Sequence, residues 1–121
     1  MLVRLLTGDD TKQVASAEAF LGRVGSAWIS HIVLVETVWV LESVYGRDRG
    51  QITSALTTLL DHRSFVLQDV DIVQAALDLF RTRRSLGFSD YLVLETARRA
   101  GHLPLATFDR ALGAVDGAER I

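Results

Sequence analysis

The sequence predicts an α/β fold in which a parallel sheet is flanked by helices. Helical patterns alternate along the chain with short apolar stretches, and the stretch LPLATF stays apolar until it reaches Asp109. A continuously apolar strand suits a parallel sheet that is covered on both faces. Strands that alternate with helices indicate a layered α/β architecture. The chain has 121 residues, so we expect residues 1–121 to form a single domain.

The start and stop signals of helices define the expected elements. We predict helices over 10–23, from 31 to about 45, and over 48–62, 70–84 and 89–101, with strands over 27–30, 64–67 and 103–109. Asp10 and Ser89 are the expected N-caps of their helices. Gly46 and Gly101 are expected helix stops, since glycine adopts the left-handed conformation that often follows a helix.

Composition excludes several classes of protein. Apolar residues make up 49% of the chain and charged residues 23%, with a single proline, which describes a globular rather than a disordered chain. The absence of cysteine excludes disulfides and thiolate metal sites. The formal net charge of −2 provides no general attraction to nucleic acid, so any contact with phosphates would have to be local.

The N-terminal stretch MLVRLL is too short for a signal peptide. The most apolar segment, WISHIVLVETVWVLESVY, contains two glutamates and one histidine, which makes it a poor membrane span. We expect a core helix there and a cytoplasmic protein without membrane contact.

Glu36 is the first candidate functional residue. Its helical neighbours at three and four residues, Ile32, Val33, Trp39 and Val40, are all apolar, which predicts a carboxylate in the buried stripe of the helix. An unpaired ionised carboxylate costs roughly several kcal/mol there, so it should be protonated, paired or bound to a metal. A pair between Glu36 and an arginine is the structural alternative.

Asp90 and Asp109 are the other candidates. Asp109 ends the last predicted strand, and ligands of parallel sheets bind beyond the carboxyl ends of strands. Asp90 falls in the first turn of the preceding helix, so both acids can approach the same sheet edge. Each also has a structural interpretation: Asp109 can cap a short helix through Leu112, and the helix dipole stabilises Asp90 by roughly 0.3 to 1 kcal/mol.

Three carboxylates from separate elements favour a hard divalent cation, Mg²⁺ or Mn²⁺. The three histidines, His31, His62 and His102, lack metal-ligand spacing, so we do not expect zinc. The chain has no nucleophile elbow, no GxGxxG and no phosphate-binding glycine loop. The remaining chemistry is phosphoryl transfer, in which metal ions activate a water and stabilise charge on the phosphate.

The segments VLVETVWVLESVYG, GFSDYLVLETARRAG and LATFDRAL together resemble the PIN-domain family, and within it the VapC-type toxin ribonucleases of toxin–antitoxin systems. The resemblance implies a three-layer fold, Mg²⁺- or Mn²⁺-dependent cleavage of RNA, restraint by an antitoxin protein, and a homodimer. By position, the resemblance identifies Glu36, Asp90 and Asp109 with three of the family's four catalytic, metal-binding acids. Thr107 matches a hydroxyl residue that often lies beside the last of them.

The fourth acid of the family is absent, because relatives open with a strand that ends in Asp-Thr-Asn or Asp-Thr-Ser. This chain resembles its relatives only from the following helix, LVRLLTGDD, onward. Arg4 argues against residues 2–6 being the first strand, since a central parallel strand buries both faces. We therefore expect a helix there, with Asp9 and Asp10 as a loop and a cap. Without the first strand, the sheet would have two exposed strand edges that need a partner. Our hypothesis is that Met1 is a misplaced start and that the natural protein is longer.

Arg81, Arg83 and Arg84 lie just before Asp90 and could contact RNA phosphates, although cations near a helix C-terminus are stabilising in any case. Both tryptophans and Tyr91 lie in apolar patterns that predict core positions.

Two further interpretations remain open. In the first, the chain is a non-catalytic partner-binding module, in which an arginine neutralises Glu36 and the aspartates are helix caps. In the second, the chain is a phosphatase that forms an aspartyl-phosphate, and this interpretation ranks below the ribonuclease and the partner-binding module.

Overall fold

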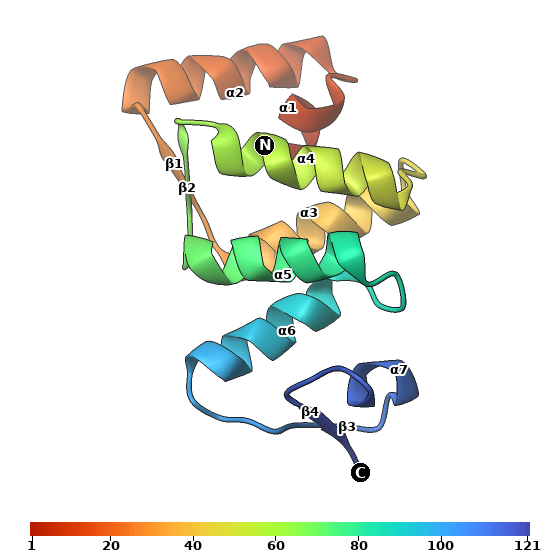
Figure 1. The fold of residues 1–121 in the computed structure, drawn as a ribbon. Helices are drawn as coiled ribbons and strands as arrows, with labels where there is room; N and C mark the ends of the chain where they lie inside the picture. Colours follow the sequence, from red (N-terminus) through yellow and green to blue (C-terminus); the bar gives the residue numbers. More distant parts are fainter. The chain divides into compact units, whose positions relative to one another are not determined.

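The computed structural model describes residues 1–121, which fall into two compact units, Met1–Gln68 and Asp69–Ile121. The first unit contains, in order, α1 (Leu2–Thr7), α2 (Thr11–Val24), β1 (Ala27–Ile29), α3 (His31–Ser43), α4 (Arg49–Asp61) and β2 (Phe65–Leu67) (Figure 1). The second contains α5 (Val70–Thr82), α6 (Phe88–Arg99), β3 (Leu105–Thr107), α7 (Arg110–Gly113) and β4 (Ala118–Arg120). The predicted α/β class, with short parallel sheets flanked by helices, is confirmed.

In the first unit, β1 and β2 form a parallel pair and lie side by side in Figure 1. The backbone N–H of Ala27 and the backbone C=O of Ile29 bond toward the β2 side. Since successive residues of a strand direct their N–H and C=O groups to opposite edges, Trp28 directs its backbone polar groups to the other edge. That edge of β1 has no neighbouring strand.

The helix starts of the first unit follow the sequence signals. Asp10 caps α2 by accepting a hydrogen bond from the backbone N–H of Gln13. Asp48 caps α4 in a capping box, in which the Gln51 side chain bonds back to the N-cap backbone. The predicted helix near the N-terminus is confirmed as α1, which ends at Gly8 with a left-handed φ of 66°.

The second unit has its own sheet, in which β3 and β4 are parallel and Leu105 lies opposite Ala118. The sequence analysis did not predict β4. Helices α5 and α6 pack against each other, and the rings of Phe80 and Phe88 meet edge to face at 6.1 Å. Tyr91 is fully buried, as predicted, and its hydroxyl donates to the backbone C=O of Arg83 at 2.8 Å.

Two local expectations are wrong in the second unit. Ser89 is not the N-cap of α6, because the helix begins one residue earlier, at the buried Phe88, and Gly87 is the N-cap. The last strand is not covered on both faces, since Ala106 at its centre is exposed. Side chains alternate between the two faces of a strand, so Ala106 lies on a face of β3 that is exposed, whereas Leu105 and Thr107 on the other face are half-buried.

The longest apolar segment of the sequence forms α3, which has 13 residues. No helix in the structure has the combination of length and apolar character needed to cross a membrane.

Candidate functional site

Asp109 follows β3 and is the N-cap of α7. Its Oδ1 accepts a hydrogen bond from the backbone N–H of Leu112 at 2.9 Å, and its own backbone N–H donates to the Oγ1 of Thr107 at 3.0 Å. Thr107 therefore holds the backbone at the position where the chain turns from strand to helix. The side chain of Asp109 is exposed, and its Oδ2 makes no hydrogen bond. One oxygen caps the helix, and the other is free to bind a cation.

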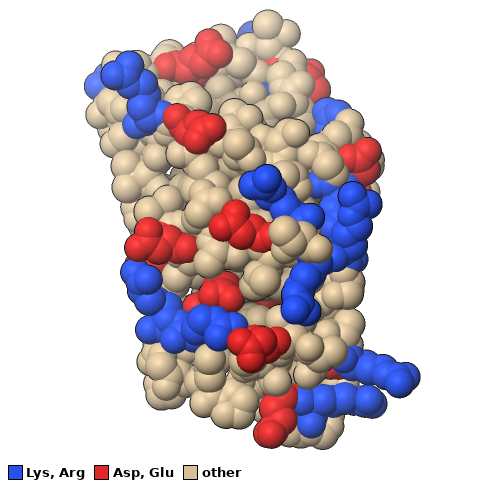
Figure 2. Space-filling model, in the orientation of Figure 1, with Lys and Arg blue, Asp and Glu red and all other residues tan.

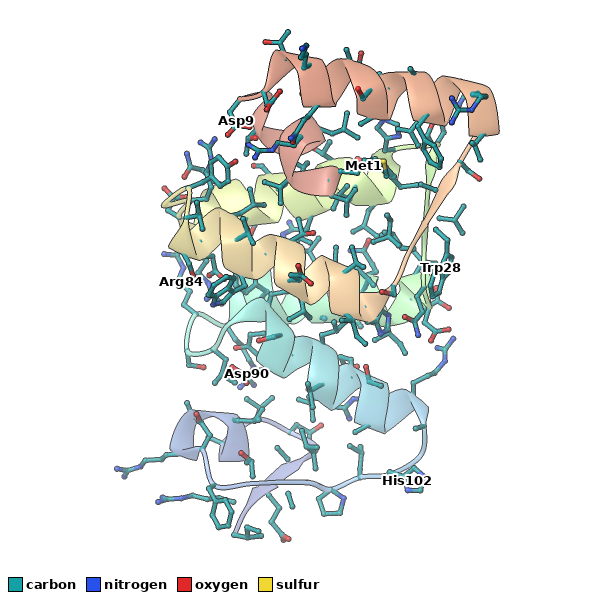
Figure 3. The ribbon with its side chains drawn as sticks, turned by 180° about the vertical axis from the view of Figure 1, so that it is seen from behind. Met1, Asp9, Trp28, Arg84, Asp90 and His102 are labelled. Atoms are coloured by element: carbon teal, nitrogen blue, oxygen red, sulfur yellow. The ribbon has the colours of Figure 1, made fainter.

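Asp90 is the third residue of α6 and is half-buried in the first turn. Figure 3 shows it at the start of this helix. Its neighbours Tyr91 and Leu92 are buried, whereas the carboxylate of Asp90 makes no hydrogen bond and no ion pair. The helix dipole stabilises this charge by roughly 0.3 to 1 kcal/mol. A carboxylate without a partner can supply the oxygen ligand that a hard divalent cation prefers.

Asp90 and Asp109 belong to the same unit. The chain leaves α6 and returns through β3, so that α7 and the start of α6 lie toward the same side of the second unit (Figure 1). The donor chemistry of both carboxylates fits Mg²⁺ or Mn²⁺. However, the structure contains no group of three or more Asp, Glu, His or Cys side chains that could hold a metal ion. The predicted metal site therefore stays a prediction.

Glu36 lies on α3, and the prediction that it is buried is wrong. Its side chain is exposed, and so are those of Ile32 and Trp39. The opposite face of α3 is the buried one, formed by Leu34, Thr37, Val38 and Leu41. Because α3 is apolar on every side, apolar neighbours did not identify the face that packs into the core. Glu36 makes no ion pair, so the arginine partner of the structural alternative is not observed.

An open cavity of about 330 Å³ lies beside Glu36 in the first unit. Its wall is largely apolar and includes Trp28, Val33 and Val40, together with the first residues of the chain. Trp28 is 64% exposed and Trp39 61% exposed, so the prediction that both tryptophans are core residues is wrong. The side chain of Trp28 lies on the exposed face of β1, and that of Trp39 on the uncovered face of α3. Figure 3 shows Trp28 on β1.

A polar cluster that the sequence did not reveal joins α1 to the segment just after α3. Arg4 Nη1 donates to both carboxylate oxygens of Asp9 at 3.0 Å, and the hydroxyl of Tyr45 donates to Asp9 Oδ2 at 2.6 Å. The hydrogen bonds from Tyr45 and from Arg4 lower the pKa of Asp9 to about 2. No sequence pattern links Asp9 to a tyrosine 36 positions away. The cluster confirms Asp9 as a loop residue with a structural partner.

The arginines proposed to contact RNA lie at the end of α5 and in the following connection. Arg81 is exposed, with Asp78 at 3.9 Å, and Arg84 is exposed in the connection to α6 (Figure 3). On the face drawn in Figure 2, Asp and Glu side chains are scattered among the Lys and Arg side chains. A role of Arg81 or Arg84 in binding RNA stays a prediction.

Comparison with known proteins identifies the family. The family model of the PIN domain matches residues 1–118, which is nearly the whole chain. No curated protein and no solved structure matches the chain. The chain therefore belongs to the PIN-domain family, whose domains are in general metal-dependent nucleases.

Proposed function

We propose that this protein is a metal-dependent endoribonuclease that acts as the toxin of a toxin–antitoxin pair, and that residues 1–121 make up one PIN domain. The observation that carries the proposal is Asp90, a half-buried residue whose carboxylate has no partner, in a chain that the PIN-domain model matches over residues 1–118. A carboxylate without a partner is free to supply an oxygen ligand to a divalent cation.

In this proposal Glu36, Asp90 and Asp109 are catalytic carboxylates that supply oxygen ligands to Mg²⁺ or Mn²⁺. The free Oδ2 of Asp109 and the absence of any ion pair at Glu36 and Asp90 support this assignment. Thr107 keeps the Asp109 backbone in place through the hydrogen bond at 3.0 Å. The bound metal would activate a water molecule and stabilise charge on the RNA phosphate. Arg81 and Arg84, both exposed, would bind neighbouring phosphates.

We further propose that the natural protein has an additional strand, upstream of Met1, that pairs with the open edge of β1. The backbone N–H and C=O of Trp28 are directed to this unpaired edge, and a largely apolar cavity lies beside Trp28. Both features support this proposal. An unpaired strand edge with exposed apolar side chains favours the addition of another strand. Such a strand would also supply the fourth acid that the resemblance to the VapC-type toxins requires.

The cellular role that we propose is that of a cytoplasmic toxin, dimeric and restrained by an antitoxin protein. The exposed apolar side chains of Ile32 and Trp39 on α3, and of Val44 directly after it, support the presence of a protein partner. The resemblance of the sequence to VapC-type toxins suggests which partners these are.

The experiment that tests the nuclease proposal compares Asp90→Asn with a matched control, Glu119→Gln. Glu119 is an exposed acid of β4 without an ion pair, so its substitution should not affect a metal site. We expect Mn²⁺ titration calorimetry to show at least a tenfold loss of affinity (a change of about 1.4 kcal/mol) in Asp90→Asn and none in Glu119→Gln.

Asp90→Asn should also cleave a single-stranded RNA more slowly than the unsubstituted chain, whereas Glu119→Gln should cleave it at the same rate. Cleavage should stop when EDTA removes the metal. Both measurements should be made on residues 1–121 and on a chain extended upstream. Equal Mn²⁺ affinity of Asp90→Asn and the unsubstituted chain in both forms would contradict the proposal.

A specific observation favours the alternative, a non-catalytic PIN module that binds a partner. No group of three potential ligands is arranged for a metal, and Asp109 already serves as a helix cap. If this alternative holds, Asp90→Asn and Asp109→Asn should leave binding of the partner unchanged, and neither chain form should cleave RNA.

A further inference from the structure

We propose that Arg98 is a positioning residue. It anchors the β3–β4 segment to α6 and thereby fixes Asp109, which follows β3, relative to Asp90 on α6. Arg98 lies in the last turn of α6, at the opposite end of the helix from Asp90. The significance for the site rests on the proposed nuclease function. The anchor itself does not, because it is built from contacts within the second unit.

The guanidinium of Arg98 is held from two sides. Its Nε donates to Oε1 of Glu95 at 3.3 Å, and the Glu95 side chain is only 12% exposed. Its Nη2 donates to the backbone C=O of Asp116 at 2.8 Å, and the Asp116 carboxylate lies 3.9 Å from Nη1. A planar guanidinium can make these bonds together because its donors form a fixed fork. Arg98 thus connects α6 to the residue just before the turn into β4.

Gly117 shows that the arginine lies close to this turn. A Cβ atom at Gly117 would lie 2.8 Å from Nη2 of Arg98, and the residue has a φ of +95°, a conformation that side-chain-bearing residues rarely adopt. Glycine is therefore favoured here by the backbone conformation, and the guanidinium of Arg98 occupies the space beside it.

A series of hydrogen bonds leads from the anchor to Asp109. The C=O of Gly117 accepts from the backbone N–H of Leu105 at 2.9 Å, at the start of β3. At the other end of the strand, the C=O of Thr107 accepts from the N–H of Ile121 at 2.9 Å, and the Oγ1 of Thr107 accepts from the N–H of Asp109. When the Asp116–Gly117 turn is held on α6, the first hydrogen bond between β3 and β4 is held as well. Asp109 follows directly after the other end of β3 and is bonded to Thr107 there.

The neighbouring Arg99 provides a matched control. It is exposed, lies on the same helix and pairs with Asp71 of α5 at 3.1 Å. An ion pair of this kind, between exposed side chains of two helices, contributes little to stability. Arg98 differs in that its shortest hydrogen bond, at 2.8 Å, is to a backbone carbonyl of the β3–β4 segment. Only the loss of Arg98 should loosen that segment.

The experiment compares Arg98→Ala, Arg98→Lys and Arg99→Ala by hydrogen–deuterium exchange and by Mn²⁺ titration. We expect Arg98→Ala to accelerate exchange of the Leu105 and Ile121 amides at least tenfold, to leave the amides of α5 unchanged, and to weaken Mn²⁺ binding at least fivefold. Arg98→Lys should show an intermediate effect, since lysine keeps the charge but lacks the fork. Arg99→Ala should change neither quantity.

Equal exchange in Arg98→Ala and Arg99→Ala, or acceleration spread equally over α5, would overturn the anchor.

The two proposals fail in different ways. If the unsubstituted chain binds no Mn²⁺ in either form, the nuclease proposal fails and the exchange data still decide whether Arg98 is an anchor. If the unsubstituted chain binds Mn²⁺ and Arg98→Ala loosens the ladder without weakening Mn²⁺ binding, the anchor holds but Arg98 is not a positioning residue.

Discussion

Oδ1 of Asp109 accepts a hydrogen bond from the backbone N–H of Leu112 at 2.9 Å, whereas Oδ2 accepts none. The same carboxylate therefore caps α7 and keeps one oxygen available. The structural and the functional interpretation of this residue are compatible, since they use different atoms. Substitutions that separate the cap from the charge can measure each contribution.

The first prediction separates them at Asp109. Asparagine keeps an oxygen that can cap the helix, so Asp109→Asn should change the free energy of unfolding little. Asp109→Ala removes the cap and should cost about 1 kcal/mol (range roughly 0.5 to 2) in a urea unfolding experiment. Both variants should lose Mn²⁺ affinity to a similar degree. Retained Mn²⁺ affinity in Asp109→Asn would show that the residue is a cap only.

The second prediction concerns the pH dependence of stability. The pKa of Asp9 is lowered from 3.8 to about 2 in the folded chain, chiefly by the hydrogen bonds from Tyr45 and Arg4. A lowered folded-state pKa stabilises the fold above the unfolded value, and this stabilisation is lost as pH falls through the folded value. Asp9→Asn should therefore destabilise the chain at neutral pH, and the difference should shrink as pH falls from 3.8 to about 2.

The side-chain carboxyl resonance of Asp9 provides a direct check in an NMR titration. Its midpoint should lie near 2 in the unsubstituted chain and should rise in Tyr45→Phe, which removes the hydrogen bond at 2.6 Å. A midpoint near the ordinary value of 3.8 in the unsubstituted chain would contradict the cluster.

The third prediction concerns the two tryptophans. Trp28 and Trp39 are both mostly exposed, so residues 1–121 should show the red-shifted emission of a solvated indole and efficient quenching by acrylamide. Trp28→Phe and Trp39→Phe assign the signal to each residue. In a chain extended upstream, the proposed strand should cover Trp28, shift its emission to the blue and reduce its quenching. Concentration-dependent protection of Trp39 would instead indicate contact between two copies.

The fourth prediction concerns the packing of Phe88 at the start of α6, the helix that carries Asp90. Phe88, the first residue of α6, is buried and packs edge to face on Phe80 at 6.1 Å. Phe88→Ala should cost roughly 3 to 5 kcal/mol of unfolding free energy, because it removes buried area and leaves a cavity. Val93→Ala on the exposed face of the same helix is the control and should cost far less. Similar losses in both variants would contradict the packing of α6.

The local signals of the sequence predicted most elements correctly. Asp10 and Asp48 start their helices, and Asp109 caps a short helix, as its structural interpretation predicts. Capping depends on groups three residues apart, so it can be read from the chain alone. The error at Ser89 has a tertiary cause, since the burial of Phe88 extends α6 toward the N-terminus beyond the polar signal.

Burial on α3 could not be predicted in the same way. Glu36 and Trp39 have apolar neighbours on the helix, but they lie on the face that the first unit leaves uncovered. A helix that is apolar all round has no polar side from which its orientation can be inferred. Only the positions of other elements decide which face packs, and the buried face here is the one with Leu34, Val38 and Leu41.

The sequence by itself determined the α/β class, the order of the elements up to β3 and the caps Asp10 and Asp48, because these depend on neighbours within one or two turns. The carboxylates of the candidate site stay a prediction of the sequence. The tertiary structure decided the exposure of Glu36, the open edge of β1, the Arg4–Asp9–Tyr45 cluster and the contact between Arg98 and the Asp116–Gly117 turn. These features join residues from different elements. Their energies depend on distances that no pattern along the chain encodes.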